Sequence, residues 1–298
     1  MQSLKTKVFT CLLSLVMVFS LVPGLNSNAA NISNGLSYKV SGGVLTIQGT
    51  GDMPDYVLQK DTKTGAFSTT APWFSSRSNI RKIVIEPGVS YVGKNSFAYL
   101  TSVTDVEFQS TGSLKKIGDQ AFYYCSALKN LVLPKGLVTI GRYTFGYTGV
   151  TTVSFPASLK TIGTYSFYDC TKLTKVSIPS GVTAIGEFAF YGDYNITSVT
   201  GGSKLQTIGK EAFAHCWGLK YFKVTSKKLK KIGLGAFVCD SKLKTIYIKN
   251  TTKLTKKGVR GSLYLSSVKT VRVKKSKVKK YKKYFKYSNS GKTVKVKK

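Results

Sequence analysis

The sequence repeats one short pattern at a nearly constant interval, and this periodicity constrains the fold more than any other feature. Each copy has an Ile-Gly pair, or Val-Gly in the first copy, and a Phe four residues after the Gly. The seven phenylalanines are Phe97, Phe122, Phe145, Phe167, Phe190, Phe213 and Phe237, at steps of 25, 23, 22, 23, 23 and 24 residues. A unit this small cannot bury its apolar side chains alone, so consecutive units must stack and share one core. The pattern predicts a mainly β repeat solenoid with these phenylalanines in its core.

Between the phenylalanines lies a motif of the form L-x-x-L-x-L, first seen at Leu128, Leu131 and Leu133. Its alternating last positions predict a short strand with one buried face. A Pro follows the motif in three copies, at Pro134, Pro156 and Pro179, where it ends the strand without needing a ladder donor. The Gly of each Ile-Gly pair is expected to form a turn. A degenerate eighth unit is built on Val268, Val271 and Val273.

The full pattern, I-G-x-x-A-F-x-x-C-x-x-L-x-x-V-x-I-P-x-x-V, resembles the BspA-like, treponemal-type leucine-rich repeat family of secreted bacterial surface proteins. Residues 43–56, Ala71-Pro72-Trp73 and residues 80–85 are similar to the N-terminal segment that many such proteins carry. The resemblance implies a right-handed horseshoe or rod of about seven to eight units of 22–25 residues, with a cap at each end. It also implies adhesion to host matrix proteins or to other bacteria.

The first 30 residues have the layout of a secretory signal peptide. Lys5 and Lys7 precede an apolar run from Val8 to Val22, which is followed by a small-residue exit at 27–30. The run is about 15 residues long, short of the roughly 20 that span a bilayer as a helix. We therefore expect a soluble, exported chain that begins near Ala30; the alternative is an uncleaved membrane anchor.

Three segments are expected after the signal peptide. Residues 31–79 form an N-terminal cap, with a strand at 44–48, a polar loop at 57–70 and a buried Trp73. Residues 80–273 form the solenoid. Residues 274–298 form a basic cap in which Val278, Tyr281 and Phe285 share one helical face; a turn at 287–290 then leads to a strand containing Val294 and Val296. A disordered basic arm is the alternative for this last segment.

Four cysteines follow the signal peptide, and their positions in the repeat point to a common role. Cys125, Cys170 and Cys216 each come three residues after a repeat Phe, and Cys239 comes two after its own. All four are expected in one small buried niche. Equivalent positions two units apart lie about 10 Å apart, beyond disulfide reach. Cys216 and Cys239 belong to adjacent units, so a disulfide or two free thiols remain open for that pair.

Side chains able to support catalysis or bind metal are scarce. The one histidine, His215, directly precedes Cys216, and chain neighbours rarely face each other as a nucleophile and its base must. No C-x-x-C pair is present for zinc, and Asp52, Asp55 and Asp61 lack the glycine and glutamate of a calcium loop. These carboxylates are expected to accept hydrogen bonds in turns. We expect no enzymatic activity, no cofactor and no metal.

Positive charge is concentrated in the last quarter of the chain. The net charge is +34, and residues 221–298 hold 26 Lys and Arg against one acid, Asp240. Outward strand positions in the late units, expected on the concave face, are Tyr221, Lys223, Thr245, Tyr247, Lys249, Arg272 and Lys274. In earlier units the same face carries acids and hydroxyls. Tyr and Arg are favoured binding anchors and clustered cations attract polyanions, so we predict that this strip binds an anionic or hydroxylated partner. The alternative is a solubilising lysine face.

These observations favour a secreted or cell-surface protein that recognises a protein or glycan noncovalently, on a host cell or another bacterium. The alternative is a structural envelope protein whose lysine-rich end holds it to anionic wall polymers; a hydrolase is a distant third. The mixture of lysine and aromatic residues in 274–287 also occurs in nucleic-acid binders, but export makes envelope polyanions the nearer partners. We expect no specific nucleic-acid partner and no transmembrane segment after signal cleavage.

Overall fold

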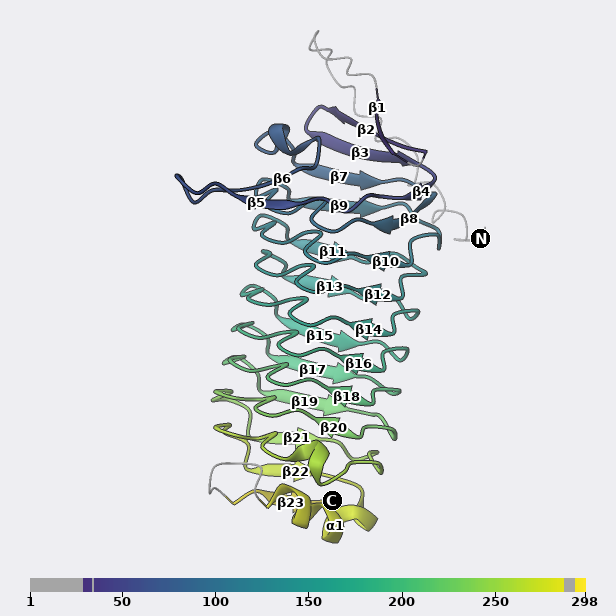
Figure 1. Cartoon of the computed structure of the whole chain (residues 1–298). Coiled ribbons are helices and arrows are strands. Elements are labelled where there is room, and N and C mark those ends of the chain that lie inside the picture. Colours follow the sequence, from purple (N-terminus) through teal and green to yellow (C-terminus); the bar gives the residue numbers. More distant parts are fainter. Residues whose placement is uncertain (1–28, 34, 287–292) are drawn as a thin grey trace, which may run out of the picture.

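The computed structural model describes residues 29–33, 35–286 and 293–298. The predicted signal peptide up to residue 28 and the predicted turn at 287–290 lie outside the described residues. The chain forms an elongated stack of about nine turns with parallel strands on two sides (Figure 1). The predicted mainly β solenoid is confirmed.

Two rows of strands run along the stack. The first row consists of β1 (Ala30–Ser33), β2 (Leu36–Ser41), β3 (Val44–Gly49), β7 (Lys82–Ile85), β9 (Asp105–Phe108), β11 (Asn130–Val132), β13 (Thr152–Ser154), β15 (Lys175–Ile178), β17 (Ser198–Gly201), β19 (Tyr221–Val224), β21 (Thr245–Tyr247), β22 (Thr270–Arg272) and β23 (Lys295–Lys297). From β3 onward the paired strands of this row are parallel. The second row is one parallel sheet of β4 (Gly51–Asp52), β8 (Val89–Val92), β10 (Lys116–Ile117), β12 (Thr139–Ile140), β14 (Thr161–Ile162), β16 (Ala184–Ile185), β18 (Thr207–Ile208) and β20 (Lys231–Ile232).

A third backbone ladder runs along the loops that carry the repeat phenylalanines. In the first full turn Asn95, Phe97 and Tyr99 each donate a backbone N–H to a carbonyl of the next turn, over 3.1, 2.8 and 2.7 Å. The pattern requires a left-handed backbone two residues before and two residues after the core residue. The non-glycine residues of the described chain with positive φ are Asn95, Tyr99, Gln120, Tyr124, Tyr143, Tyr147, Tyr165, Asp169, Phe188, Glu211, His215, Cys239 and Leu265, and all occupy these positions. Such residues cost about 1–2 kcal/mol each, so the stacked turns must hold them in place.

The core is a single column of aromatic rings surrounded by aliphatic side chains. Phe122, Phe145, Phe167, Phe190, Phe213 and Phe237 are all fully buried. Ring centroids of consecutive phenylalanines from Phe97 to Phe213 lie 5.0–5.3 Å apart, and the step from Phe213 to Phe237 widens to 6.2 Å. The leucine motif residues are buried as predicted. Each turn therefore contributes one ring that neither it nor its neighbour could shield alone.

The glycine of each Ile-Gly pair is required for close approach, which corrects the expected turn-forming role. None of these seven glycines has a positive φ. A Cβ at Gly163 would instead lie 2.4 Å from the carbonyl oxygen of Gly141 in the preceding turn. Backbones of adjacent turns touch here, so only a residue without a side chain fits.

The N-terminal segment packs on the first turn much as expected. Leu45 and Ile47 of β3 are fully buried, and β3 pairs in parallel with β7. Trp73 is buried, lies 5.6 Å from the Phe97 ring centroid and donates its indole N–H to Ser96 O over 2.8 Å. The 3-10 helix η1 (Phe74–Ser76) follows directly. Trp73 thus continues the phenylalanine column as its N-terminal end.

The expected polar loop at 57–70 is wrong, because this segment is a β-hairpin. Strands β5 (Leu58–Lys60) and β6 (Phe67–Thr69) pair antiparallel and project from the side of the stack (Figure 1). The Asp61 carboxylate accepts the backbone N–H groups of Lys63 and Thr64, both over 2.8 Å, and so fixes the connecting turn. The polar composition concealed the strands because a projecting hairpin has little apolar surface to bury.

The C-terminal end forms the predicted helix and strand. After η2 (Lys257–Val259) and η3 (Lys275–Lys277), α1 spans Val278–Phe285 and buries Tyr281 and Phe285. β23 then returns and pairs in parallel with β22, with Val271 opposite Val296. The predicted helical face and the final strand are confirmed.

The niche three residues after each core residue is buried in every turn, but Cys239 does not occupy it. The residues in this position are Leu100, Cys125, Thr148, Cys170, Asp193, Cys216, Asp240 and Ser266, all buried. Cys239 comes one residue too early and is exposed, and Cys216 and Cys239 are both free thiols. The prediction that Cys239 lies in the niche is therefore wrong, because Asp240 occupies that position.

Candidate partner-binding surface

The predicted binding strip lies on adjacent parallel strands near the C-terminal end of the first row. Register aligns Lys223, Tyr247, Arg272 and Lys297 across β19, β21, β22 and β23. The Tyr221 and Tyr247 rings pack with their centroids 5.3 Å apart. Tyr221, Lys223, Lys249 and Lys274 are exposed, and Thr245, Tyr247 and Arg272 are half-buried. The structure therefore brings Tyr221, Lys223, Tyr247 and Arg272 together, and it places Lys249 and Lys274 just beyond the strand ends.

Arg272 already has a partner within the chain. Its Nη1 donates to the carbonyl oxygen of Lys298 over 2.7 Å. This contact ties the last residue of the chain to β22 and orients the guanidinium within the strip. Sequence reasoning assigned Arg272 only to partner binding, because nothing in the sequence shows that the chain end returns beside it.

Next to the strip is a basic cavity that the sequence analysis missed. It has a volume of about 470 Å³ and is lined by Lys244, Lys269, Lys295 and Lys297 together with Ser266, Ser267, Val268, Thr270 and Thr293. Backbone hydrogen bonds place these lysines on successive turns, since Lys269 N–H donates to Lys244 O and Lys295 N–H donates to Lys269 O, both over 2.9 Å. Four lysines and several serine and threonine residues line one hollow, and ammonium and hydroxyl groups are donors that suit an anion.

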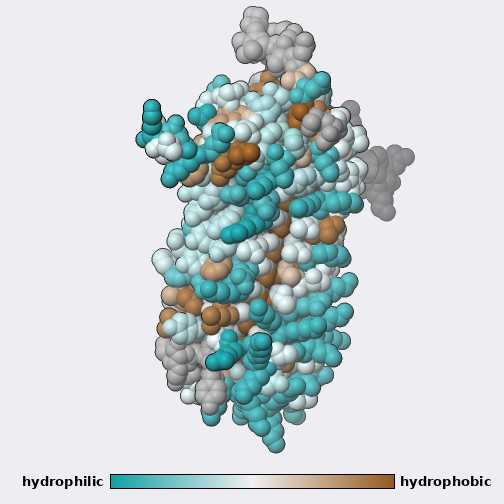
Figure 2. All heavy atoms as spheres, viewed as in Figure 1, coloured by the Kyte–Doolittle hydropathy of each residue, from teal (hydrophilic) through white to brown (hydrophobic). Residues whose placement is uncertain are grey.

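Residues 221–298 have no exposed acidic side chain to balance this charge. Asp240 is the one acid among residues 221–298, and it is fully buried. Its Oδ1 accepts the backbone N–H of Cys216 over 2.9 Å. Burial raises the pKa of Asp240 well above its usual range, which favours the neutral acid. Figure 2 shows hydrophilic side chains gathered over the end of the stack that carries α1 and β23.

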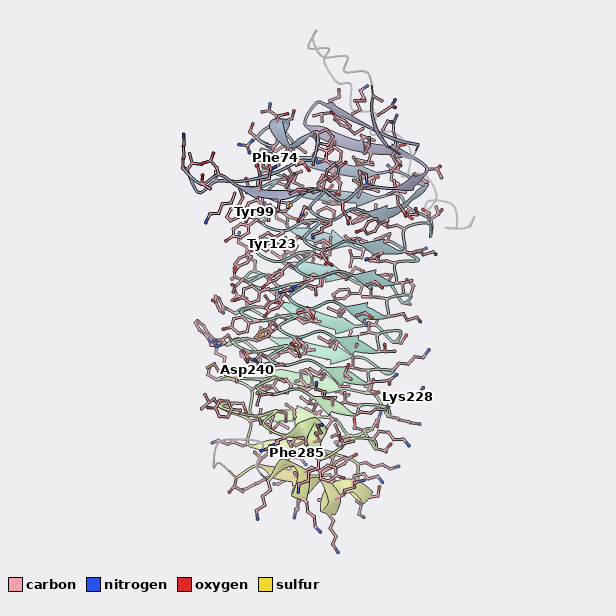
Figure 3. The ribbon with its side chains drawn as sticks, viewed as in Figure 1. Phe74, Tyr99, Tyr123, Lys228, Asp240 and Phe285 are labelled. Carbon is pink, nitrogen blue, oxygen red and sulfur yellow. The ribbon has the colours of Figure 1, made fainter. Side chains whose placement is uncertain are left out.

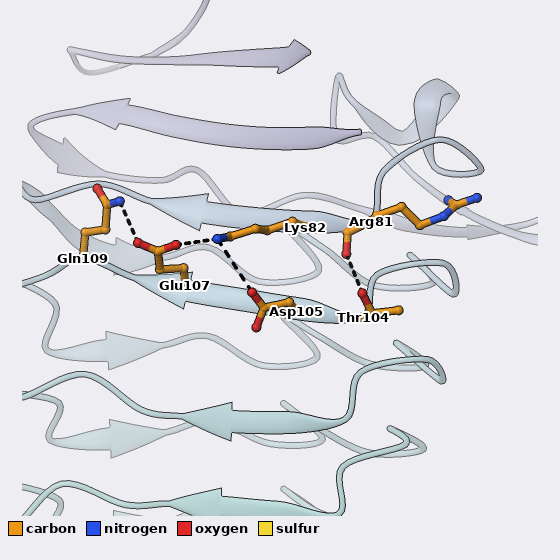
Figure 4. Close-up of polar contacts among 6 residues, drawn as sticks. All are labelled: Arg81, Lys82, Thr104, Asp105, Glu107 and Gln109. Atoms are coloured by element: carbon orange, nitrogen blue, oxygen red, sulfur yellow. Dashed lines mark hydrogen bonds and ion pairs between the residues drawn. The ribbon is translucent and has the colours of Figure 1, made fainter. Parts of the chain in front are cut away.

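At the N-terminal end of the same strand face the charges are paired instead. Lys82 Nζ lies 2.6 Å from Glu107 and 3.8 Å from Asp105, and Gln109 donates to Glu107 over 2.8 Å (Figure 4). The hydrogen bond between Lys82 and Glu107 lowers the pKa of Glu107 and raises the pKa of Lys82. The acids of this region are therefore engaged within the protein.

The residues considered for catalysis or metal binding have structural roles. Asp52 accepts a hydrogen bond from Ser90, and Asp55 accepts from Tyr91 Oη and Lys94 N–H over 2.8 and 2.7 Å. The expected role as a turn acceptor is confirmed for Asp61, whereas Asp52 and Asp55 accept hydrogen bonds from the next coil of the stack. His215 lies on a loop corner with its ring centroid 4.9 Å from that of Tyr191, whereas Cys216 points into the core and donates to Phe190 O. In the described part of the chain no three His, Cys, Asp or Glu side chains cluster to hold a metal ion.

A second feature missed from the sequence is a band of stacked aromatic side chains along the loop edge. One column contains Phe67, Tyr99, Tyr124 and Tyr147, with centroid distances of 5.0, 5.1 and 4.5 Å and interplanar angles of 20° or less. A parallel column contains Tyr143, Tyr165 and Phe188 at 4.4 and 4.7 Å. Figure 3 shows Tyr99 and Tyr123 along this edge, opposite Lys228. The signal was the set of aromatic residues that lie one or two residues after, or two residues before, the core Phe in the turns from Phe97 to Phe190.

Parallel strands stacked by a repeating apolar motif, with variable outward side chains, define a leucine-rich repeat protein. The BspA type leucine rich repeat region matches residues 71–174 and 160–292 in six copies. The chain belongs to this family. Within the described residues no helix is long and apolar enough to cross a membrane.

One solved structure, with a TM-score above 0.5, agrees on the fold. A leucine-rich repeat protein from T. pallidum (TpLRR) is 22% identical with a TM-score of 0.52, covering 72% of this chain and 90% of its own. A leucine-rich repeat protein from Eubacterium ventriosum has a TM-score of 0.38 at 19% identity, with 82% and 84% covered. A leucine rich cell surface protein from Faecalibacterium prausnitzii has a TM-score of 0.30 at 18% identity, with 82% and 88% covered. No curated protein matches the sequence.

Proposed function

We propose that the protein is secreted and recognises an anionic polymer noncovalently at a bacterial or host surface. The binding surface is the strip from Tyr221 to Lys274 together with the basic cavity beside it. The observation that carries the proposal is that Lys244, Lys269, Lys295 and Lys297 line one cavity, in a region (221–298) whose single acidic side chain is buried. Unbalanced cations at one end of a rod attract a polyanion at long range, and the cavity supplies short-range contacts.

Two roles fit this partner class. In the adhesive role, the polymer belongs to a host cell or to another bacterium, as the membership of a family of surface proteins favours. In the structural role, the polymer is a phosphodiester or acidic glycan of the producing cell's own wall. Both roles use the same chemistry, because phosphate, sulfate and carboxylate groups all accept hydrogen bonds from ammonium groups.

The experiment measures binding of the purified chain from Ala30 to immobilised wall teichoic acid and to neutral dextran, at about 50 and about 500 mM salt. We expect salt-sensitive binding to the polyanion and none to dextran. Changing Lys244, Lys269 and Lys295 to Gln should weaken binding at least about tenfold, because close ammonium contacts are lost from the cavity. The triple change of Tyr221, Tyr247 and Arg272 to Ala tests the strip in the same assay.

The matched control changes Lys129, Lys160 and Lys175 to Gln, which removes the same charge from exposed positions in earlier turns. This variant should bind almost as well as the unchanged protein. An equal loss in both triple lysine variants would show that diffuse charge suffices and would remove the cavity from the proposal. Binding that survives high salt, or that none of the variants weakens, would overturn it.

A further inference from the structure

One turn of the stack has a shorter loop than its neighbours. Val150 comes five residues after Phe145, whereas Leu128 and Leu173 come six residues after Phe122 and Phe167. Gly149 in this loop is buried, and a Cβ there would lie 2.3 Å from Ser126 O of the preceding turn. With one residue fewer, the loop has less chain to project from the stack than the loops on either side.

The shortened loop and its neighbours line an aromatic notch with a volume of about 480 Å³. Tyr124, Ser126 and Tyr147 line its N-terminal side, and Asp169, Lys172 and Tyr194 line its C-terminal side. Tyr194 is exposed and stacks on the exposed Trp217, with ring centroids 4.5 Å apart. The notch is therefore walled by aromatic side chains and contains one carboxylate and one ammonium group.

The aromatic column of Phe67, Tyr99, Tyr124 and Tyr147 stops at this notch. The equivalent positions in the next two turns hold Asp169 and Gly192, so no ring of the column follows Tyr147. The ring of Tyr168 lies 5.4 Å away at an angle of 56°, which is tilted and not stacked. The end of the column leaves space where a ring-shaped group can stack.

Asp169 is placed to accept hydrogen bonds in this space. Among the described residues no hydrogen bond engages its carboxylate, although the group is half-buried. Gly192 makes room for it, because a Cβ there would lie 2.1 Å from Asp169 Oδ1. Burial raises the pKa of Asp169, and the charge of His215 lowers it. A partly desolvated acceptor beside an open aromatic face needs a ligand that has both hydroxyl donors and an apolar face.

We propose that the aromatic notch binds an uncharged hexopyranose unit of a glycan, with its ring packed on Tyr147 and a hydroxyl donating to Asp169. The C–H groups on one face of a pyranose suit the negative face of an aromatic ring. The sugar hydroxyls suit a carboxylate and the serine and threonine hydroxyls around it. Asp169 and Lys172 balance each other in charge, which favours a neutral sugar over an anionic one. A few placed polar groups on an aromatic wall are typical of small-ligand sites.

This site is separate from the proposed polyanion surface. It lies on the loop edge of the turns between Tyr124 and Tyr194, whereas the basic cavity lies between Lys244 and Lys297. The two sites would let one rod contact a neutral glycan and an anionic polymer independently.

The test uses the chain from Ala30 and saturation-transfer NMR with the methyl glycosides of glucose, galactose and N-acetylglucosamine. We expect transfer to at least one of them. Asp169→Tyr should abolish it, because the new ring continues the column that Tyr99, Tyr124 and Tyr147 form at the same backbone position, with φ of 58–61° at those three residues. This variant has a ready conformation, so its fold should be retained. Asp169→Asn should weaken binding at least about fivefold through loss of a charged acceptor.

The control is Tyr264→Ser, which removes an exposed aromatic side chain outside the notch and should leave binding unchanged. Unchanged binding in Asp169→Tyr would overturn the proposal, as would the absence of transfer from all three glycosides. Asp169→Tyr should also retain teichoic acid binding, so failure at one site is distinguishable from failure at the other.

Discussion

In the turns from Phe97 to Phe190 the loop edge carries stacked aromatic side chains, whereas in the later turns the same left-handed positions hold Glu211, His215, Gly235, Cys239 and Leu265. The strand face changes in parallel, from paired Lys82 and Glu107 to lysines without surface acids. The first-row strands and the buried core continue through both regions, whereas the second-row sheet ends at β20. The comparison teaches that core and hydrogen-bonding positions fix the fold, and that the outward positions are free to become two chemically different surfaces.

The two regions also differ in how they accommodate left-handed backbone. In the earlier turns the strained tyrosines stack on each other, and aromatic pairs contribute about 0.5–1.5 kcal/mol beyond burial. In the later turns Gly235 and Gly261 relieve the strain directly, but Leu265 is exposed with φ of +49° and has no ring to stack on. The aromatic columns thus offset a local cost as well as presenting a surface.

The largest difference in stability between the two regions should appear when a phenylalanine of the buried column is replaced by alanine. Phe190→Ala should lower the free energy of unfolding by about 3–5 kcal/mol, because it opens a cavity between two rings stacked at 5.3 and 5.2 Å. Phe237→Ala should cost less, since its one stacked neighbour, Phe213, lies 6.2 Å away, although Phe222 packs edge-on against it at 4.8 Å. Urea unfolding followed by circular dichroism measures both. An equal or larger cost at Phe237 would show that the two regions are equally well packed.

A smaller effect should depend on pH. Burial raises the pKa of Asp193 and of Asp240 well above 3.8, and each Oδ2 has no hydrogen-bond partner. The unfolded chain ionises above about pH 4 while these buried groups stay protonated, so their contribution to stability is fully present below that pH and is lost as pH rises. Asp193→Asn and Asp240→Asn should therefore stabilise the protein at pH 8.

The same variants should have little effect at pH 4, because a neutral carboxyl and an amide differ little in desolvation. Asn keeps an oxygen for the Cys170 or Cys216 N–H that Asp193 or Asp240 accepts. Unfolding by urea at the two pH values gives the comparison, and an equal change at pH 4 and pH 8 would contradict it. Asp193 lies in the earlier turns and Asp240 in the later turns. A pH-dependent stabilisation in only one of the two variants would show that the two regions differ in how they bury this carboxyl group.

The smallest effect concerns strain at the loop edge. Leu265→Gly should raise the free energy of unfolding by about 0.5–1 kcal/mol, the relief of left-handed strain less the added freedom of the unfolded chain. Tyr124→Gly should instead lower it by about 1–2 kcal/mol, because stacking on Tyr99 and Tyr147 is lost. Thermal unfolding of both variants measures the contrast. A stabilised Tyr124→Gly would mean that stacking contributes less than strain costs.

Much of the fold could be predicted because the buried positions are apolar and recur at a regular spacing in the sequence. The spacing of the phenylalanines, the leucine motif, Trp73 and the face of Tyr281 and Phe285 all follow from the need to cover apolar groups. Counting three residues from Phe237 would also have placed Asp240 in the niche. The hairpin at 58–69 had no such pattern, because its strands pack little apolar surface into the core.

The candidate sites were harder to predict, because they depend on which side chains meet across turns. The strip of Tyr221, Tyr247 and Arg272 was predictable, since outward strand positions alternate with buried ones. The basic cavity was not, because Lys295 joins Lys244 and Lys269 only after the chain passes through α1 and returns as β23. The notch was also hidden, since its lining residues come from four loops, one of which is a residue shorter than the others.

The sequence by itself determined the stacking unit, its period and the identity of the buried rings, since an apolar pattern that repeats every 22–25 residues has few ways to leave water. Only the tertiary structure decided the rest: that glycines serve close approach, that tyrosines stand in left-handed backbone, and that lysines far apart in the chain converge. The physical reason is that burial is a property of each residue type, whereas contacts between turns depend on register, which backbone hydrogen bonds set after the chain has coiled.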